Sequence, residues 1–182
     1  MIEVEVKVLI KCIQKIEEKL QSAGFKIGKT VKESDVYFDN IQNDVKNNDQ
    51  ALRIRSCEDS TTGEWSHYMT FKGPKIDTVS MTRKELEMQV ESAEVGKEIL
   101  CSLGYTQMYP VIKNRQYYRK NQITACLDRV DGLGDFLELE MVVNGENEKG
   151  NALKQLIDIL EELGYDLEDM IRESYLSMIQ KK

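Results

Sequence analysis

Ionisable side chains recur at every second position in five short segments of the sequence. The segments contribute Glu3, Glu5 and Lys7; Arg53 and Arg55; Arg83, Glu85 and Glu87; Lys113 and Arg115; and Glu138 and Glu140. Because successive side chains of a β-strand point to opposite faces, each set would lie on one face of its strand. The sequence therefore predicts a sheet with a strongly charged surface.

Two interpretations of this surface are open. An antiparallel sheet often has one packed and one solvated face, and alternating charge is typical of the solvated one. However, Glu3 with Glu5 and Glu138 with Glu140 place like charges about 7 Å apart on one face, where they repel unless something bridges them. Paired carboxylates suit a divalent cation, and clustered arginines suit phosphate. A metal-bound polyphosphate would satisfy both groups.

Length and composition limit the class of protein. With 182 residues, of which 41% are apolar, the chain is expected to form a single domain over residues 1–182. It contains no apolar stretch of transmembrane length, and its N-terminus lacks the pattern of a secretory signal, so we expect a cytoplasmic location. The net charge of -7 argues against nucleic acid as the main partner. Four cysteines without a CxxC pair, and one histidine, argue against a structural zinc site.

The elements that position the charged residues can be read from hydrophobic periodicity and turn signals. Strands are expected at residues 2–10, 34–39, 51–57, 64–72, 81–90, 111–119, 122–130 and 136–143. Helices are expected at about 11–24, 92–104, 151–164 and 167–179, and the first three end at a glycine followed by an aromatic residue. The polar segment 40–50 is expected to be a mobile loop.

Eight strands with four helices predict an α+β fold. We expect a closed eight-stranded antiparallel β-barrel, or tunnel, with the helices packed outside. Closure would turn the charged faces inward and leave a polar lumen for a slender ligand. The alternative is an open sheet with helices on one side, which would leave the charges in water.

Eight motifs occur in an order that resembles a known family. They are EVEVK, DVYFD, ALRIR, TFKGPK, RKELE, KNR, LDRVDGLGDFLELE and SYLSMI. In this order the chain resembles the CYTH superfamily, the triphosphate tunnel metalloenzymes. ALRIR, TFKGPK and GLGDFLE together are most similar to the class IV adenylyl cyclase branch. The first motif alone is common in charged strands, whereas the ordered set is specific.

The resemblance implies a tunnel that binds a linear triphosphate together with Mg²⁺ or Mn²⁺. The residues that match metal-holding carboxylates are Glu3, Glu5, Glu138, Glu140 and Asp128, with Glu85 as a further candidate. Those that match the phosphate-binding cations are Lys7, Arg53, Arg55, Lys72, Arg83, Lys113 and Arg115. The catalytic candidates are Glu3, Glu85, Asp128 and Lys113. With six acids against seven bases, neither metal nor triphosphate is expected to bind well alone.

Three functions remain open at this point. The cyclase branch implies conversion of ATP to cyclic AMP and pyrophosphate. The first alternative is a hydrolase that releases orthophosphate from tripolyphosphate or thiamine triphosphate, and the second is a non-catalytic triphosphate-binding module. The expected partner is a small-molecule triphosphate, with neither nucleic acid nor a membrane, and a homodimer is an open alternative. No motif identifies a nucleobase pocket.

Overall fold

The computed structural model describes residues 1–42 and 44–182, and Asn43 in the polar 40–50 segment lies outside the described residues. The described residues form these elements in chain order: β1 (Ile2–Ile10), α1 (Ile13–Ser22), β2 (Lys26–Asp39), β3 (Ala51–Asp59), β4 (Trp65–Lys75), β5 (Arg83–Val90), α2 (Ala93–Ser102), β6 (Thr106–Gln107), β7 (Val111–Lys120), β8 (Ile123–Val130), β9 (Gly134–Val143), α3 (Glu146–Leu163), a 3₁₀ turn (Leu167–Asp169) and α4 (Tyr175–Gln180).

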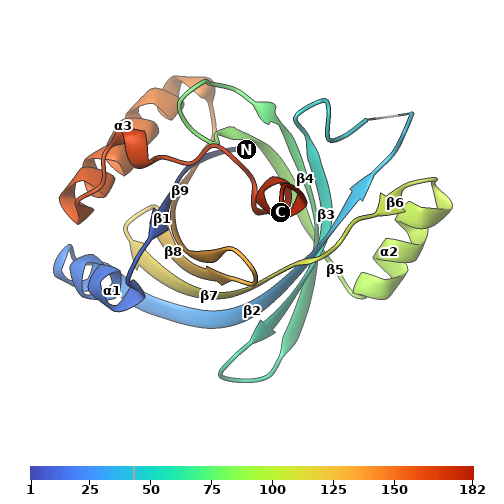
Figure 1. The fold of residues 1–182 in the computed structure, drawn as a ribbon, viewed down its shortest axis with the longest axis horizontal. Helices are drawn as coiled ribbons and strands as arrows, with labels where there is room; N and C mark the ends of the chain where they lie inside the picture. The colour runs from blue at the N-terminus through green and yellow to red at the C-terminus, as the bar shows by residue number, and fades with distance from the viewer. Residues whose placement is uncertain (43) are drawn as a thin grey trace.

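Eight of the strands close into a barrel. They follow the order β3, β4, β5, β1, β9, β8, β7, β2, and β2 pairs in turn with β3. All of these pairings are antiparallel, and Figure 1 shows the resulting ring of strands. The short β6 adds to the end of β2. The predicted α+β fold with a closed eight-stranded antiparallel barrel is confirmed, and the open sheet is excluded.

The ladder between β1 and β5 is much shorter than its neighbours. Only two residue pairs join these strands, Ile2 with Lys84 and Glu3 with Arg83, whereas nine pairs join β1 to β9. Beyond these pairs, the Met81 amide donates to the Glu5 carbonyl at 3.0 Å and the Glu85 amide donates to the Met1 carbonyl at 3.4 Å. This seam lies beside the first charged residue of the tunnel.

The alternation in β1 buries both faces of the strand. Val4, Val6 and Val8 are fully buried on the outer face, where they pack against α1 and α3. Glu5 and Lys7 on the inner face are also buried, with 6% and 3% of their surfaces exposed. A wet sheet face would leave such side chains exposed, so the charges line an enclosed interior.

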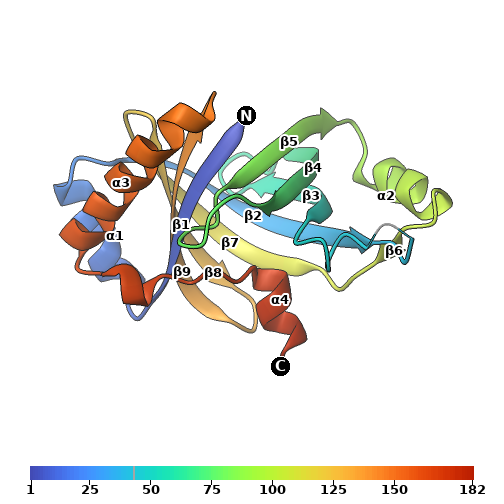
Figure 2. The same cartoon turned by 90° about the horizontal axis from the view of Figure 1, so that it is seen from above.

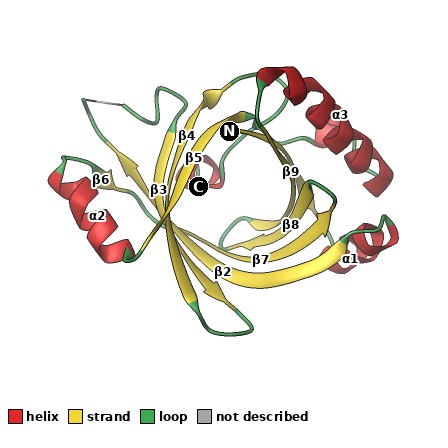
Figure 3. Ribbon diagram, turned by 180° about the vertical axis from the view of Figure 1, so that it is seen from behind, coloured by secondary structure: helices red, strands yellow, loops and turns green. Residues whose placement is uncertain are grey.

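The helices α1, α2 and α3 cover the barrel from outside (Figures 2 and 3). Leu20 of α1 and Leu156 of α3 join the core of β1, β8 and β9, whereas Leu100 of α2 packs with Ile54 of β3. These apolar contacts account for the helical spacing in the sequence. None of the described helices is long and apolar enough to span a membrane.

The glycine signals for helix ends are confirmed. Gly24, Gly104 and Gly164 have φ angles of 88°, 86° and 89°, a left-handed conformation that a side chain would disfavour. After each glycine, the amide of the aromatic residue donates a hydrogen bond back to a leucine carbonyl, as from Tyr165 to Leu160. The glycines therefore turn the chain sharply from helix into strand or loop.

Two boundaries differ from the sequence expectation. β2 begins at Lys26, eight residues before the expected start, and pairs with β7 across a register shift between Ile27 and Thr30. Gly28 permits this contact, because a Cβ there would lie 3.1 Å from the Tyr117 carbonyl oxygen. Such a bulge interrupts the two-residue period on which the prediction relied. Similarly, α3 begins at Glu146, before the expected start at residue 151. The prediction missed the first turn of this helix because that turn is polar and shows no apolar period.

The expected helix over 167–179 is wrong in its first half. Residues Leu167–Asp169 form a 3₁₀ turn and only Tyr175–Gln180 form α4. Between them Met170 forms a β-bridge with Val8, and the Ile171 amide donates to the Lys7 carbonyl. Pairing with β1 competes with helix formation there. α4 consequently lies across one end of the barrel rather than along its outer wall (Figures 1 and 2).

Leu156→Ala tests the role of α3 in holding the barrel closed. Leu156 is fully buried against β1 and β9, so we expect a loss of about 2–5 kcal/mol in the free energy of unfolding. Urea denaturation would measure this loss. The matched control, Leu103→Ala, truncates a leucine that is 67% exposed and should stay within about 0.5 kcal/mol of the wild type. Equal losses in both variants would contradict the assignment.

Candidate active site

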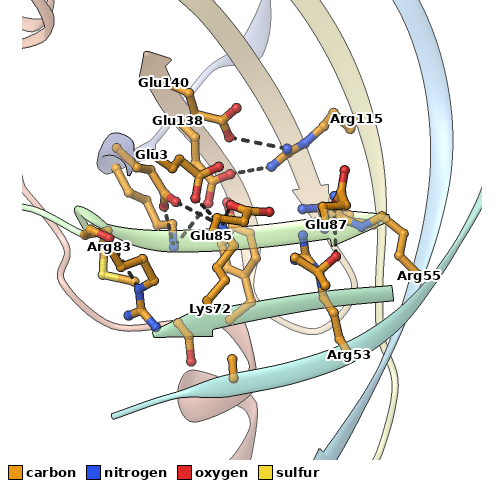
Figure 4. Close-up of a pocket in the computed structure, with 18 of the residues that line it drawn as sticks. Glu3, Arg53, Arg55, Lys72, Arg83, Glu85, Glu87, Arg115, Glu138 and Glu140 are labelled. Carbon is orange, nitrogen blue, oxygen red and sulfur yellow. Dashed lines mark hydrogen bonds and ion pairs between the residues drawn. The ribbon is translucent and has the colours of Figure 1, made fainter. Parts of the chain in front are cut away.

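The inward faces of seven strands meet in one cavity of about 220 Å³ inside the barrel. All seven predicted phosphate-binding cations line it, and so do five of the predicted acids. The cations are Lys7, Arg53, Arg55, Lys72, Arg83, Lys113 and Arg115, and the acids are Glu3, Glu5, Glu85, Glu138 and Glu140. Figure 4 shows many of these side chains converging. The sixth predicted acid, Asp128, is fully buried behind Arg115.

Three carboxylates form a compact group. Glu3 and Glu5 come from β1 and Glu140 from β9, where it pairs directly with Glu5. One oxygen from each residue lies within 4.8 Å of the other two. Burial and neighbouring carboxylates raise the pKa values of Glu3 and Glu5, and they raise that of Glu140 to about 8 although Arg115 opposes the shift. Such crowded oxygen donors fit a hard divalent cation, which would offset their repulsion.

The Lys72 side chain of β4 reaches this carboxylate group. Its ammonium contacts Glu3 and lies 3.0 Å from Glu85 Oε2 and 3.9 Å from Glu5 Oε2 (Figure 4). Burial would lower the pKa of Lys72, but the charges of Glu3, Glu85 and Glu5 outweigh burial and hold the pKa above its ordinary value. Lys72 is therefore a charged ammonium within the acidic part of the tunnel.

Glu138 of β9 lies between two cations. Lys7 Nζ is 3.1 Å from Glu138 Oε1, and Arg115 contacts the other oxygen. Burial would raise the pKa of Glu138, but the charges of Lys7 and Arg115 hold it well below its ordinary value. In this structure Glu138 neutralises cations and does not join Glu3, Glu5 and Glu140, so its predicted metal role stays a prediction.

Asp128 of β8 has donors at both oxygens. Arg115 donates two hydrogen bonds of 2.6 Å, and the Tyr175 hydroxyl donates at 3.0 Å. Lys113 Nζ lies 3.4 Å away. This pattern fixes the guanidinium of Arg115 and the end of Lys113, which is a positioning role. The predictions of metal binding or proton transfer by Asp128 stay untested.

Two further acids of the site were not predicted from the sequence. Glu33 and Asp35 of β2 are 0% and 1% exposed and face the arginines of β3. Arg55 donates to the Asp35 carboxylate at 2.6 and 2.7 Å and lies 3.2 Å from Glu33. A signal was present, because KESDVYFD places Glu33, Asp35 and Tyr37 on one strand face. This signal is weaker than the others because the strand face carries an aromatic residue as well as the two acids.

Tyr175 is a third residue whose place the charge pattern could not show. It is buried at the start of α4, and its ring centroid lies 4.3 Å from Lys7 Nζ and 5.2 Å from Lys113 Nζ. The ring also packs edge-on against Phe136 at 5.0 Å. The SYLSMI motif marked this segment, but only the folded chain brings it beside both lysines.

The additional acids change the charge balance of the interior. With Glu33 and Asp35 added to the six predicted acids, eight carboxyl groups that are buried or partly buried face the seven cations. Glu87 also lines the cavity, where it accepts a hydrogen bond from Thr70, but it is exposed. Six of the seven cations are paired with acids inside the barrel, and Arg83 lies 3.9 Å from the more exposed Asp49, so an anionic ligand must compete for them.

The barrel, its charged lumen and its carboxylate group define a tunnel that can hold a polyanion with a cation. A model of the CYTH domain matches residues 1–175. The chain belongs to the CYTH family.

Individual relatives agree with this assignment. The chain is 42% identical over 178 residues to a putative adenylate cyclase of Methanocaldococcus jannaschii, with 98% of both chains covered. It is 26% identical over 149 residues to the adenylate cyclase CyaB of Aeromonas hydrophila, covering 82% of this chain and 73% of that protein.

Solved structures share the fold. A Pyrococcus horikoshii protein matches with a TM-score of 0.89 and 34% identity over 98% of both chains. A Hippeastrum protein, described as a putative adenylyl cyclase with a dominant triphosphatase activity, matches with a TM-score of 0.66. The alignment covers 99% of this chain and 95% of that one at 17% identity, which shows a shared fold.

Glu140→Gln tests the crowding of the carboxylate group. The pKa of Glu140 lies above its ordinary value of 4.5, so its ionisation weakens the metal-free fold as the pH rises toward about 8. At pH 8 in chelator, we expect the variant to melt a few degrees higher than the wild type, since about 1 kcal/mol corresponds to about 2–4 °C at this size. Mn²⁺ should stabilise the variant less than the wild type. Glu161→Gln on the exposed face of α3 is the control, and a lower melting temperature for Glu140→Gln would contradict the interpretation.

Acid titration tests the pairing of Glu33. Burial opposes ionisation of this residue, but Arg55, Lys113 and Arg115 lower its pKa from 4.5 to about 2. A lowered pKa in the folded state contributes stability above pH 4.5, which is lost as the pH falls toward 2. Between pH 5 and pH 2 the free energy of unfolding of the wild type should fall by roughly 2–4 kcal/mol more than that of Glu33→Gln. Urea denaturation across this range measures it, and parallel curves for the variant and the wild type would refute the pairing.

Proposed function

We propose that the protein is a divalent-metal-dependent enzyme that converts ATP to cyclic AMP and pyrophosphate in the barrel tunnel. The observation that carries the proposal is the convergence of seven cations and a three-carboxylate group in one cavity. A polyphosphate and a divalent cation are the ligands that these two groups recognise. The names of the relatives from Methanocaldococcus jannaschii and Aeromonas hydrophila support the cyclase activity.

In the proposed enzyme, Glu3, Glu5 and Glu140 would hold the metal, and their oxygen donors suit Mg²⁺ or Mn²⁺. When bound, such an ion supplies positive charge to phosphate oxygens and acidifies the groups that it binds. Glu138 and Asp128, which were also predicted to hold metal, serve in this proposal to neutralise and orient Lys7, Lys113 and Arg115.

The cations of the tunnel bind and orient the triphosphate. Arg55 and Arg115 are held rigidly by Asp35 and Asp128, so each presents a fixed guanidinium to the phosphates. Lys7 and Lys113 add charge from the end that Tyr175 closes. This preorganised charge stabilises the negative charge that develops during phosphoryl chemistry.

The cyclisation forms one bond and breaks another at the α-phosphorus. The ribose 3′-oxygen attacks this phosphorus, its proton passes to a base, and the bond to pyrophosphate breaks. Of the carboxylates predicted as the base, Asp128 has both oxygens engaged by donors, whereas Glu3 and Glu85 share the single ammonium of Lys72. Glu3 and Glu85 are therefore the better candidates.

A hydrolase that releases orthophosphate is the second candidate. The residues that support it are the same, because the charged lumen recognises phosphates and not a nucleobase. The description of the Hippeastrum protein as having a dominant triphosphatase activity favours keeping this alternative. Here water replaces the ribose oxygen as the attacking group. A non-catalytic triphosphate binder would use the cations but would have no need for the three crowded carboxylates.

Product analysis separates these functions. Purified protein is incubated with ATP, thiamine triphosphate and tripolyphosphate in Mg²⁺ or Mn²⁺, and the products are resolved by chromatography. Cyclic AMP with pyrophosphate supports the cyclase, orthophosphate alone supports the hydrolase, and binding by calorimetry without any product supports the binding module.

Glu5→Gln tests the metal role within the same assay. Glu5 is 6% exposed and belongs to the three-carboxylate group, so its neutralisation should lower kcat/KM by about a hundredfold or more. Raising the metal concentration should restore part of the activity. Glu161→Gln provides the control for the same change outside the tunnel. A fully active Glu5→Gln variant would argue against the proposed metal site.

A further inference from the structure

The ammonium group of Lys72 lies beside the carboxylates that could hold a divalent cation. It contacts Glu3 and lies 3.9 Å from Glu5 Oε2, and these are two of the three residues that fit a divalent ion. Glu85 Oε2 lies 3.0 Å from the same nitrogen. Lys72 thus neutralises part of the charge that a divalent ion would neutralise.

Lys72 differs from the arginines of the tunnel in how it is held. Arg55 and Arg115 each donate two hydrogen bonds to one buried aspartate, which fixes the plane of the guanidinium. Lys72 instead carries a point charge on a flexible four-carbon stem, and its partners are the crowded carboxylates. Its nitrogen can therefore exchange carboxylate partners for phosphate without moving the strand.

Mutual repulsion links the two ligands to this side chain. A divalent ion at Glu3 and Glu5 and an ammonium at the same oxygens are like charges that compete for one set of partners. A phosphate that draws the ammonium away leaves these carboxylates open to a metal. Conversely, a metal that displaces the ammonium releases a cation for phosphate.

Lys7 lies 3.6 Å from Glu5 and Arg115 lies 3.5 Å from Glu140, but each also binds other acids of the tunnel. We infer that Lys72 is the exchangeable counter-ion of the metal-holding carboxylates and that its exchange couples metal binding to triphosphate binding. The inference rests on the proposed function, because the released ammonium binds the phosphate of the substrate. By linkage, the factor by which metal tightens triphosphate binding equals the factor by which triphosphate tightens metal binding. Lys72 acts in this way as a positioning residue whose removal has opposite effects on the two ligands.

Calorimetric titration of metal-free protein with Mn²⁺, without any triphosphate, tests the competition directly. Lys72→Met removes the competing charge, so we expect Mn²⁺ to bind about tenfold more tightly than to the wild type. Lys72→Arg keeps the charge and should stay within about threefold of the wild type. These fold-changes exceed the usual error of such titrations, since tenfold corresponds to about 1.4 kcal/mol.

Arg83→Met is the matched control for the loss of one tunnel cation. Arg83 lines the same cavity, but its guanidinium lies 3.9 Å from Asp49 and donates to the Met81 carbonyl, away from the carboxylate group. We expect Mn²⁺ affinity to change by less than about threefold in this variant. An equal gain in Arg83→Met and Lys72→Met would indicate a general field effect and would overturn the inference.

The coupling is measured with tripolyphosphate in chelator and in saturating Mn²⁺. For the wild type we expect the metal to tighten tripolyphosphate binding by about tenfold more than for Lys72→Met. Comparing the two proteins under identical conditions cancels the binding of Mn²⁺ to tripolyphosphate in solution. An unchanged coupling in Lys72→Met would contradict the exchange.

The outcomes distinguish this inference from the proposed function. If Lys72→Met melts cooperatively and binds Mn²⁺ no more tightly than the wild type, the inference is wrong. Lys72→Gln repeats the measurement with a polar side chain in case the Met variant does not fold. If the wild type binds and converts no triphosphate, the proposed function fails, and the titration with Mn²⁺ alone still decides whether Lys72 competes with the metal.

Discussion

The pairing of buried charges inside the barrel is the constraint on which the rest of the structure depends. Ions removed from water are costly unless they are paired and hydrogen-bonded, and the lumen holds eight buried or partly buried carboxyl groups against seven cations. The pairs Arg55 with Asp35 and Arg115 with Asp128 meet this requirement through two hydrogen bonds each. The three-carboxylate group has only shared partners. Glu3 and Glu5 share the ammonium of Lys72, and Glu140 lies 3.5 Å from Arg115, which already binds Asp128. It is therefore the part of the wall where an added cation lowers the electrostatic cost most.

The outer face of the barrel follows from the same constraint. Strands whose inner face carries charge can gain hydrophobic stabilisation only from their outer face, so the valines of β1 must be covered by helices. α1 and α3 cover β1, β8 and β9, and α2 covers part of β3. These three helices, α1, α2 and α3, are thus remote from the chemistry but necessary for a barrel that can hold ions in its interior.

Much of the fold and many of the lumen residues could be predicted because two simple periods run through the sequence. Glu3, Glu5 and Lys7 alternate with valines, and this alternation identified both faces of β1. The residues that were missed depend on contacts between distant segments. Asp35 belongs to the site because the neighbouring strand places Arg55 beside it. Tyr175 belongs to it because the C-terminal segment crosses the end of the barrel and brings its hydroxyl to Asp128. The bulge near Gly28 likewise depends on the backbone of Tyr117, which no local pattern reveals.

The β-ladder between β1 and β5 has only two residue pairs, so the barrel is held together less firmly here than between β1 and β9. Eight seams close the barrel. This one has two ladder pairs, flanked by backbone hydrogen bonds from Glu85 to Met1 and from Met81 to Glu5, against nine pairs on the other side of β1. Local fraying of a closed sheet begins where cross-strand bonds are fewest, so amide protons near Ile2 and Lys84 will exchange with solvent before those of the β1 and β9 pair. Because Glu3 and Arg83 pair at this seam and both line the cavity, such fraying reaches the wall beside the three-carboxylate group.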